Sequence, residues 1–232
     1  MTTEAFYPKV EFVSREAIEN NAAMLIRNYC IERNLKEVPI PIPIEDIAKY
    51  VGYEITFDDL DAVIGVGTLA AIDFENNYIM IDEKLVPENG GNKGRYSYSI
   101  AHEIGHHRFH KHLIKKPNLD LFDDKPTDNK LFCRNTENPL AQQKPSIEIQ
   151  ADMFAASLLM PAQLVKNMAR EFKNFETMYN ESDRLKMIRT ISDTMATSRE
   201  ASEYRLVDLK IIPSKEQISD WEINGNITLL VS

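Results

Sequence analysis

The chain has 232 residues, of which 43% are hydrophobic and 27% charged, and its formal net charge is -9. The hydrophobic content suffices for one sizeable core. The negative net charge argues against direct binding of nucleic-acid phosphates, which needs a face rich in lysine and arginine. No segment approaches the roughly 18 uninterrupted apolar residues of a membrane span, and the N-terminus lacks the pattern of a secretory signal, so we expect a cytoplasmic protein without a membrane partner.

Two helices are predicted near the N-terminus. Residues 14–34 place apolar side chains at helical spacing after Ser14, which is a suitable N-cap. Residues 44–52 form a shorter helical pattern that follows a proline-rich run, and Gly52 can terminate it.

Three β-prone segments follow these helices. They cover residues 53–57, 68–74 and 78–82. The turn residues Glu75, Asn76 and Asn77 separate the last two segments and predict a hairpin. The segment 78–82 is either an interior strand or an edge strand. As an edge strand it would be the best candidate to pair with an extended substrate by strand addition.

The rest of the chain is predicted to be mainly helical, with one long interruption. Helices are expected over residues 95–116 and 146–160, and further helical segments continue to about residue 210. Residues 117–145 carry four prolines and little periodicity, which predicts a surface excursion that is either a mobile loop or a lid over a cleft. The expected parts are an N-terminal helical segment (1–36), a core (37–165) and a helical C-terminal subdomain with a tail (166–232).

All five histidines lie between positions 102 and 112, and they include an HExxH motif at 102–106. On a helix, positions i and i+4 share one face, so His102 and His106 can reach one ion, while Glu103 is rotated by about 100° beside them. Such an ion activates water and polarises a scissile carbonyl, and Glu103 is the candidate general base. The alternative is a polar stripe of histidines on a surface helix.

A catalytic zinc site needs a third protein ligand and an open position for water. His110 lies roughly 12 Å along the helix from His102 and cannot share its ion, and His112 is disfavoured because no glycine ends the helix before it. Glu148 is the remaining candidate, because an ionised acid in an apolar helical stretch needs a partner. Asp152, one turn further on, is predicted to hydrogen-bond the far nitrogen of a ligand histidine.

The donor set and the remaining polar residues leave two questions open. Two imidazoles and one carboxylate suit Zn²⁺ best, and Mn²⁺ or Fe²⁺ can occupy the same ligands. Tyr96, Tyr98 and His110 are candidates to stabilise an oxyanion, but the spacing favours none of them. Cys30 and Cys133 lie far apart without a CxxC pairing and indicate no cysteine zinc site.

These motifs resemble those of the ImmA/IrrE family of metallopeptidases. The segment AHEIGHHRFH at 101–110 is similar to the family's AHELGHxxLH, and EIQADMFAASLLMP at 148–161 is similar to its ExEAnxFAaxLLMP. Residues 41–55 and 197–212 are more weakly similar to the opening and closing segments of the family.

The resemblance implies an α+β, zincin-like fold in which a small sheet packs on the HExxH helix, followed by a helical C-terminal part. It implies that His102, His106 and Glu148 bind the metal and that Glu103 is the base. It also implies a metal-dependent endopeptidase acting on a specific protein, a helix-turn-helix transcriptional repressor. The alternative is a metal-containing antirepressor that inactivates the repressor without cleavage.

The sequence departs from the family pattern at two positions. Gln150 stands where the family has a second glutamate, so the carboxylate ligand is Glu148 alone. Lys210 stands where the family has a glycine, which leaves open a different fold for the closing segment.

Overall fold

The computed structural model describes residues 10–113, 132–135, 146–172 and 181–218. These residues form an α+β fold, which confirms the predicted class. The chain divides into two compact units, Met1–Pro161 and Ala162–Ser232. The boundaries expected after residues 36 and 165 stay a prediction.

Within its described residues, the first unit contains the helices that the sequence predicts. They are α1 (Arg15–Glu32), α2 (Ile44–Tyr50), α4 (Lys93–His110) and α5 (Ser146–Leu159). The structure adds a short helix that the sequence does not predict, α3 (Leu60–Val63), and 3-10 turns at Glu83–Leu85, Pro87–Asn89 and Lys111–Leu113. The Ser14 side chain caps α1 by accepting a hydrogen bond from the Ala17 amide at 3.2 Å. Gly52 follows α2 with a φ of 93°, a conformation that favours glycine at the end of a helix.

A four-stranded mixed sheet lies in the first unit, with the strand order β1-β3-β2-β4. The strands are β1 (Glu54–Asp58), β2 (Thr68–Asp73), β3 (Tyr78–Asp82) and β4 (Phe132–Asn135). Strands β2 and β3 pair antiparallel, which confirms the predicted hairpin, whereas β1 pairs parallel with β3. The Asp73 carboxylate accepts from the backbone amides of Glu75 and Asn76, both at 2.9 Å, and so stabilises the turn.

Strand β3 is an interior strand, which rules out the edge position considered for residues 78–82. Its backbone pairs with β1 on one side and with β2 on the other. No hydrogen-bonding edge is left for an extended substrate, so strand addition at β3 is excluded. Within the described residues, β1 and β4 are the edge strands of the sheet.

The segment 117–145 is not purely an irregular excursion. Its described part, Phe132–Asn135, forms β4 and pairs antiparallel with β2. A strand this short can form because β2 already offers a row of unpaired backbone groups. The other residues of this segment, and with them the question of a lid, lie outside the described residues.

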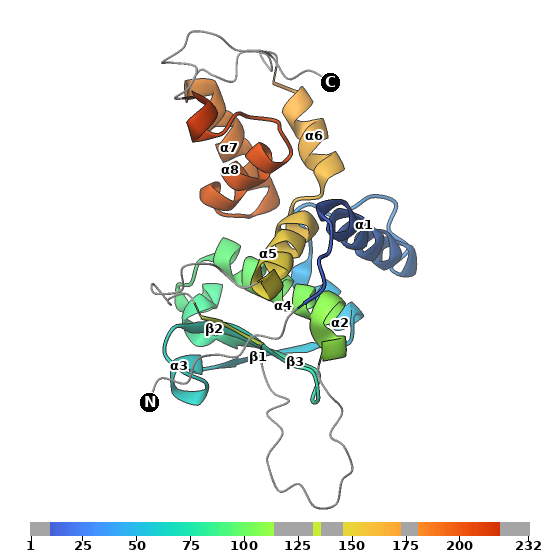
Figure 1. Ribbon diagram of the computed structural model, residues 1–232, viewed down its shortest axis with the longest axis vertical. Helices are drawn as coiled ribbons and strands as arrows, with labels where there is room; N and C mark the ends of the chain where they lie inside the picture. Colours follow the sequence, from blue (N-terminus) through green and yellow to red (C-terminus); the bar gives the residue numbers. More distant parts are fainter. Residues whose placement is uncertain (1–9, 114–131, 136–145, 173–180, 219–232) are drawn as a thin grey trace, which may run out of the picture. The chain divides into compact units, whose positions relative to one another are not determined.

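Helix α4 is the central element of the first unit. It packs against β2 and β3 on one side and against α5 on another, and Figure 1 shows it between the sheet and α5. Helix α1 packs against α5. The fully buried core side chains come from the sheet and from these helices: Ile72, Ile79, Ile100, Ile104 and Phe154. The small sheet therefore supports the helix that carries the HExxH motif.

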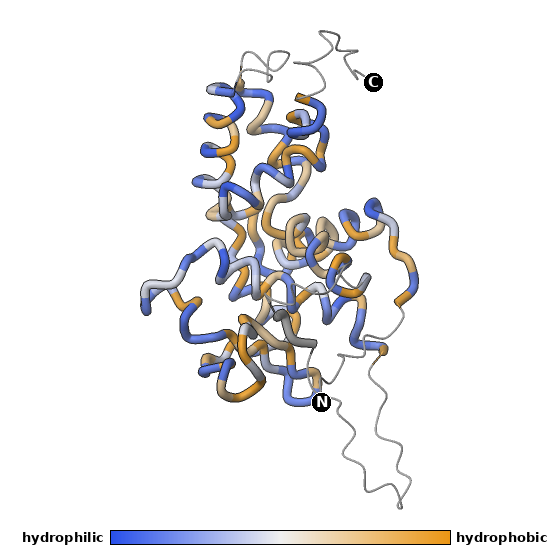
Figure 2. The backbone as a smooth tube through the Cα atoms, turned by 60° about the vertical axis from the view of Figure 1, so that its left-hand side comes forward, coloured by the Kyte–Doolittle hydropathy of each residue, from blue (hydrophilic) through white to orange (hydrophobic). Residues whose placement is uncertain are grey.

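The second unit is helical where it is described. Its helices are α6 (Ala162–Arg170), α7 (Glu181–Met195) and α8 (Arg199–Asp208). Figure 2 shows hydrophobic and hydrophilic residues alternating along these helices, as expected of helices that bury one face. Across the described residues of both units, no helix is both long and apolar enough to cross a membrane.

Lys210 ends α8 in the conformation that a glycine would take. Its φ is 57°, and the amides of Lys210 and Ile211 bond to the carbonyls of Val207 and Leu206 at 2.9 and 2.8 Å. Lysine therefore occupies a left-handed helix end at a cost of about 1 kcal/mol.

Because of this strain, we expect Lys210→Gly to raise the free energy of unfolding by about 0.5–1 kcal/mol, measured by urea denaturation. Lys210→Ala is the matched control, since it removes the charge but keeps a Cβ. A stabilisation of the same size in the alanine variant would show that charge, and not backbone strain, is responsible.

Candidate metal centre

The close crossing of α4 and α5 brings the candidate ligands together. A Cβ placed on Gly105 would lie 3.0 Å from the Ala151 Cα and 3.1 Å from its carbonyl oxygen. Any side chain at this position would crowd the Ala151 backbone, which accounts for a glycine in the middle of a helix despite its low helix propensity. The approach places Glu148, three residues before Ala151, beside the two histidines of the motif.

Enlarging residue 105 is therefore expected to damage the site. Gly105→Val should force the helices apart, lower stability by about 1–3 kcal/mol through overpacking and weaken metal affinity. Gly105→Ala should have a smaller effect, because one methyl group clashes less and alanine favours the helix. Thermal unfolding and zinc titration of both variants test this, and a valine variant with unchanged melting and affinity would show that the crossing does not position Glu148.

Three ligand atoms converge between the two helices. His102 Nε2 lies 3.0 Å from His106 Nε2 and 3.2 Å from one Glu148 oxygen, and His106 Nε2 lies 3.4 Å from the other. All three side chains are buried. The ligand atoms lie within 4.8 Å of one another, close enough to hold one metal ion.

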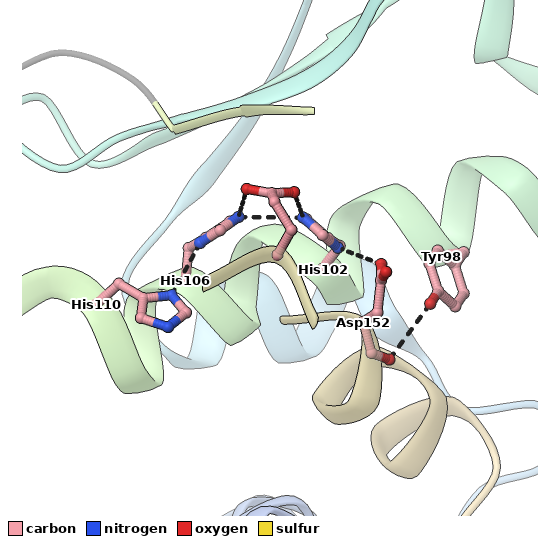
Figure 3. A network of polar contacts seen from close by, with 6 residues as sticks. Tyr98, His102, His106, His110 and Asp152 are labelled. Atoms are coloured by element: carbon pink, nitrogen blue, oxygen red, sulfur yellow. Dashed lines mark hydrogen bonds and ion pairs between the residues drawn. The ribbon is translucent and has the colours of Figure 1, made fainter. Parts of the chain in front are cut away.

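Both histidine rings are held from behind by polar side chains, as Figure 3 shows. His102 Nδ1 lies 2.9 Å from an Asp152 oxygen, the contact expected from the sequence, and His106 Nδ1 lies 2.9 Å from His110 Nδ1. Each ring therefore points its Nε2 atom toward the other ring and toward Glu148. This is the usual arrangement of ligand histidines whose second nitrogen is fixed by a hydrogen bond.

The distances fit a tetrahedral ion. With Zn–N distances of about 2.0–2.1 Å, two ligand atoms at the tetrahedral angle lie roughly 3.3 Å apart. The two imidazole nitrogens lie 3.0 Å apart, and each lies 3.2 or 3.4 Å from a different Glu148 oxygen, so these separations are close to that value.

The charges at the site also favour a cation. Burial lowers the pKa of His102, but hydrogen bonds to Asp152 and Glu148 outweigh it and raise that pKa to about 9. Burial opposes ionisation of Glu148, yet its contacts with His102 and His106 hold its pKa well below the usual range. Burial lowers the pKa of His106, which favours its neutral, ligating form. Metal binding would thus replace a proton that the acids hold on His102.

The candidate base lies in the same buried environment. Glu103 has no exposed surface, and its charge contributes to the raised pKa of His102. The Glu103 carboxylate is therefore electrostatically coupled to His102, one of the candidate ligands.

Each of the three oxyanion candidates has a partner away from the ligand atoms. The Tyr98 hydroxyl donates to the Asp152 carbonyl at 3.3 Å. Tyr96 hydrogen-bonds Glu45, and burial is the main reason that its pKa is raised. His110 is fully buried and contacts His106 and Gln150. His112, the disfavoured ligand candidate, is exposed on a 3-10 turn.

Sequence reasoning missed the role that contact geometry gives to His110 and Gln150. The sequence excludes His110 as a ligand of the ion at His102, whereas its neighbour in the structure is His106, one turn away. The sequence marks Gln150 as a replaced glutamate, and in the structure its side-chain oxygen lies 3.1 Å from His110 Nε2. The i+4 spacing of His106 and His110 was the available signal.

The fold and the site together define a zincin-like metallopeptidase. The family model described as the IrrE N-terminal-like domain, which is a peptidase family, matches residues 48–207. The chain therefore belongs to this family, which confirms the resemblance seen in the motifs. No curated protein sequence matches the chain.

Proposed function

We propose that the chain is a zinc-type endopeptidase that hydrolyses a peptide bond in a specific protein. His102, His106 and Glu148 are the proposed metal ligands, and Glu103 is the proposed general base. The observation that carries the proposal is the convergence of three ligand atoms, two from α4 and one from α5, inside the HExxH helix crossing. Mn²⁺ and Fe²⁺ suit the same donors, and zinc is chosen for its preference for nitrogen and carboxylate ligands in a tetrahedral site.

Each side chain has a defined task in this reaction. When bound, the ion would supply Lewis-acid polarisation of the scissile carbonyl and make water more acidic. Glu103 accepts a proton from the attacking water, whose oxygen bonds to the carbonyl carbon. Glu103 then returns the proton to the leaving amine as the C–N bond breaks. Asp152 keeps the His102 ring oriented throughout.

The proposed substrate is a helix-turn-helix transcriptional repressor, and the reaction would take place in the cytoplasm. This part of the proposal is supported by membership of the ImmA/IrrE family and by the acidic net charge of -9, which does not favour direct DNA binding. The protein would then relieve repression by acting on the repressor and not on its operator.

The test is to incubate the zinc-loaded protein with the helix-turn-helix regulator encoded nearest to it and to identify fragments by mass spectrometry. We expect one new pair of peptide termini, and none after removal of the metal by a chelator. A regulator that stays intact while losing its operator binding would support the antirepressor alternative. Cleavage that survives complete metal removal would contradict the proposed mechanism.

A further inference from the structure

A chain of hydrogen bonds runs from the proposed ligand His106 to the N-terminal segment. His106 Nδ1 contacts His110 Nδ1 at 2.9 Å, and His110 Nε2 contacts the Gln150 side-chain oxygen at 3.1 Å. The Gln150 amide nitrogen donates to the Glu11 carbonyl at 2.8 Å. Figure 3 shows His110 on the side of His106 away from His102 and Asp152.

The last link fixes the direction of the whole chain. A backbone carbonyl only accepts, so the Gln150 nitrogen must face Glu11 and its oxygen must face His110. An amide oxygen also only accepts, so His110 carries its proton on Nε2. A neutral His110 then has a bare Nδ1, which requires the proton between the two rings to belong to His106 Nδ1.

This proton arrangement determines which nitrogen of His106 faces the proposed metal site. A neutral His106 with its proton on Nδ1 presents a bare Nε2 lone pair, and that atom faces His102 and Glu148. His110 and Gln150 are buried, with relative exposures of 0% and 6%, so water does not readily replace them in this chain.

We propose that His110 and Gln150 are positioning residues that hold His106 in its metal-binding tautomer through a one-way hydrogen-bond chain anchored on the Glu11 carbonyl. The inference deepens the proposed function, because it assigns to His106 the support that Asp152 provides for His102. The two histidines are thus held by different partners. The Asp152 carboxylate holds His102, and the neutral pair of His110 and Gln150 holds His106.

Two substitutions at Gln150 separate positioning from packing. Gln150→Glu keeps an oxygen that accepts from His110 Nε2 and loses only the bond to Glu11. Gln150→Leu has a similar size and loses both bonds. We expect the glutamate variant to bind zinc at least as tightly as the wild type, and the leucine variant to bind roughly two- to tenfold more weakly. His110→Ala should weaken zinc binding by about 10–100-fold.

The experiment is a zinc competition titration against a chromophoric chelator, with nitrogen-15 NMR of the histidine rings in the metal-free protein. We expect His106 to be protonated on Nδ1 in the wild type and to lose this preference in the leucine variant. His112→Ala removes an exposed histidine and is the control, for which we expect unchanged affinity. If Gln150→Glu and Gln150→Leu weaken zinc binding equally, or if His106 carries its proton on Nε2 in the wild type, the positioning role is wrong.

Neither measurement uses a substrate, so the two proposals can fail separately. Zinc affinities and tautomers that follow the expected order, combined with an intact regulator, would contradict the peptidase proposal alone. Regulator cleavage combined with equal affinities for the two Gln150 variants would contradict the positioning role alone.

Discussion

Glu103→Gln is expected to lower the rate of peptide-bond hydrolysis by a factor of about 10²–10⁴, the usual contribution of general acid-base catalysis. Glutamine has nearly the same size as glutamate but cannot accept the proton of the attacking water. Because Glu103 is not one of the three converging ligands, zinc affinity should stay close to that of the wild type. Single-turnover cleavage and chelator competition on the same preparation measure the two properties.

The matched control for this substitution is Glu75→Gln, which makes the same chemical change at an exposed turn between β2 and β3. It should cleave at the wild-type rate. A Glu103→Gln protein that retains zinc and full activity would remove Glu103 from the mechanism. A variant that loses zinc would instead assign Glu103 to the support of the metal site.

Glu148→Ala is expected to weaken zinc binding more than any substitution behind the ligands. Losing an outer partner of a ligand histidine costs about 10–100-fold in metal affinity, so losing a ligand itself should cost more than about 100-fold. Asp152→Asn is the appropriate comparison, because asparagine still offers an oxygen to His102 Nδ1 but carries no charge. We expect the affinities to fall in the order wild type, Asp152→Asn, Glu148→Ala.

This order is measured by the same competition titration, with circular dichroism to confirm that each variant is folded. Burial lowers the pKa of His102, but its hydrogen bonds to Asp152 and Glu148 outweigh burial and raise that pKa, which favours a protonated ring in the absence of an ion. Zinc binding should therefore release protons, which a weakly buffered titration detects. A Glu148→Ala protein that binds zinc as tightly as the wild type would show that the third ligand lies elsewhere.

The sequence predicted the main elements of the site because their signals are local. The pattern around Ser14 predicts α1, and the HExxH spacing places two imidazoles on one face of α4. Glu148 was identified as an acid in an apolar helical stretch, a position that needs a compensating partner. The structure brings its carboxylate to the two imidazoles.

Other features depended on contacts between distant segments and could not be read from local patterns. The interior position of β3 depends on its direct pairing with β1, although β2 lies between the two strands in the sequence. Strand β4 is a four-residue strand in a proline-rich segment, and only the free edge of β2 makes it a strand. The chain through His110 and Gln150 ends at Glu11, which lies 139 positions from Gln150 in sequence.

The closing segment shows how backbone geometry can persist when a residue type changes. Lysine at position 210 replaces the family's glycine, which left open a different ending for α8. Lys210 nevertheless adopts a φ of 57°, and the last carbonyls of the helix are satisfied by the amides that follow. The hydrogen bonds of the helix end stabilise this conformation at a modest cost in strain.

X-ray absorption spectroscopy of the zinc-loaded protein tests the central claim most directly. We predict one ion per chain with only nitrogen and oxygen neighbours at about 2.0–2.2 Å, two of them imidazoles, one a carboxylate and one exchangeable with solvent. The imidazole signal should fall in a His106→Ala protein. A sulfur neighbour at about 2.3 Å, or four protein ligands with no exchangeable position, would contradict a catalytic centre formed by His102, His106 and Glu148.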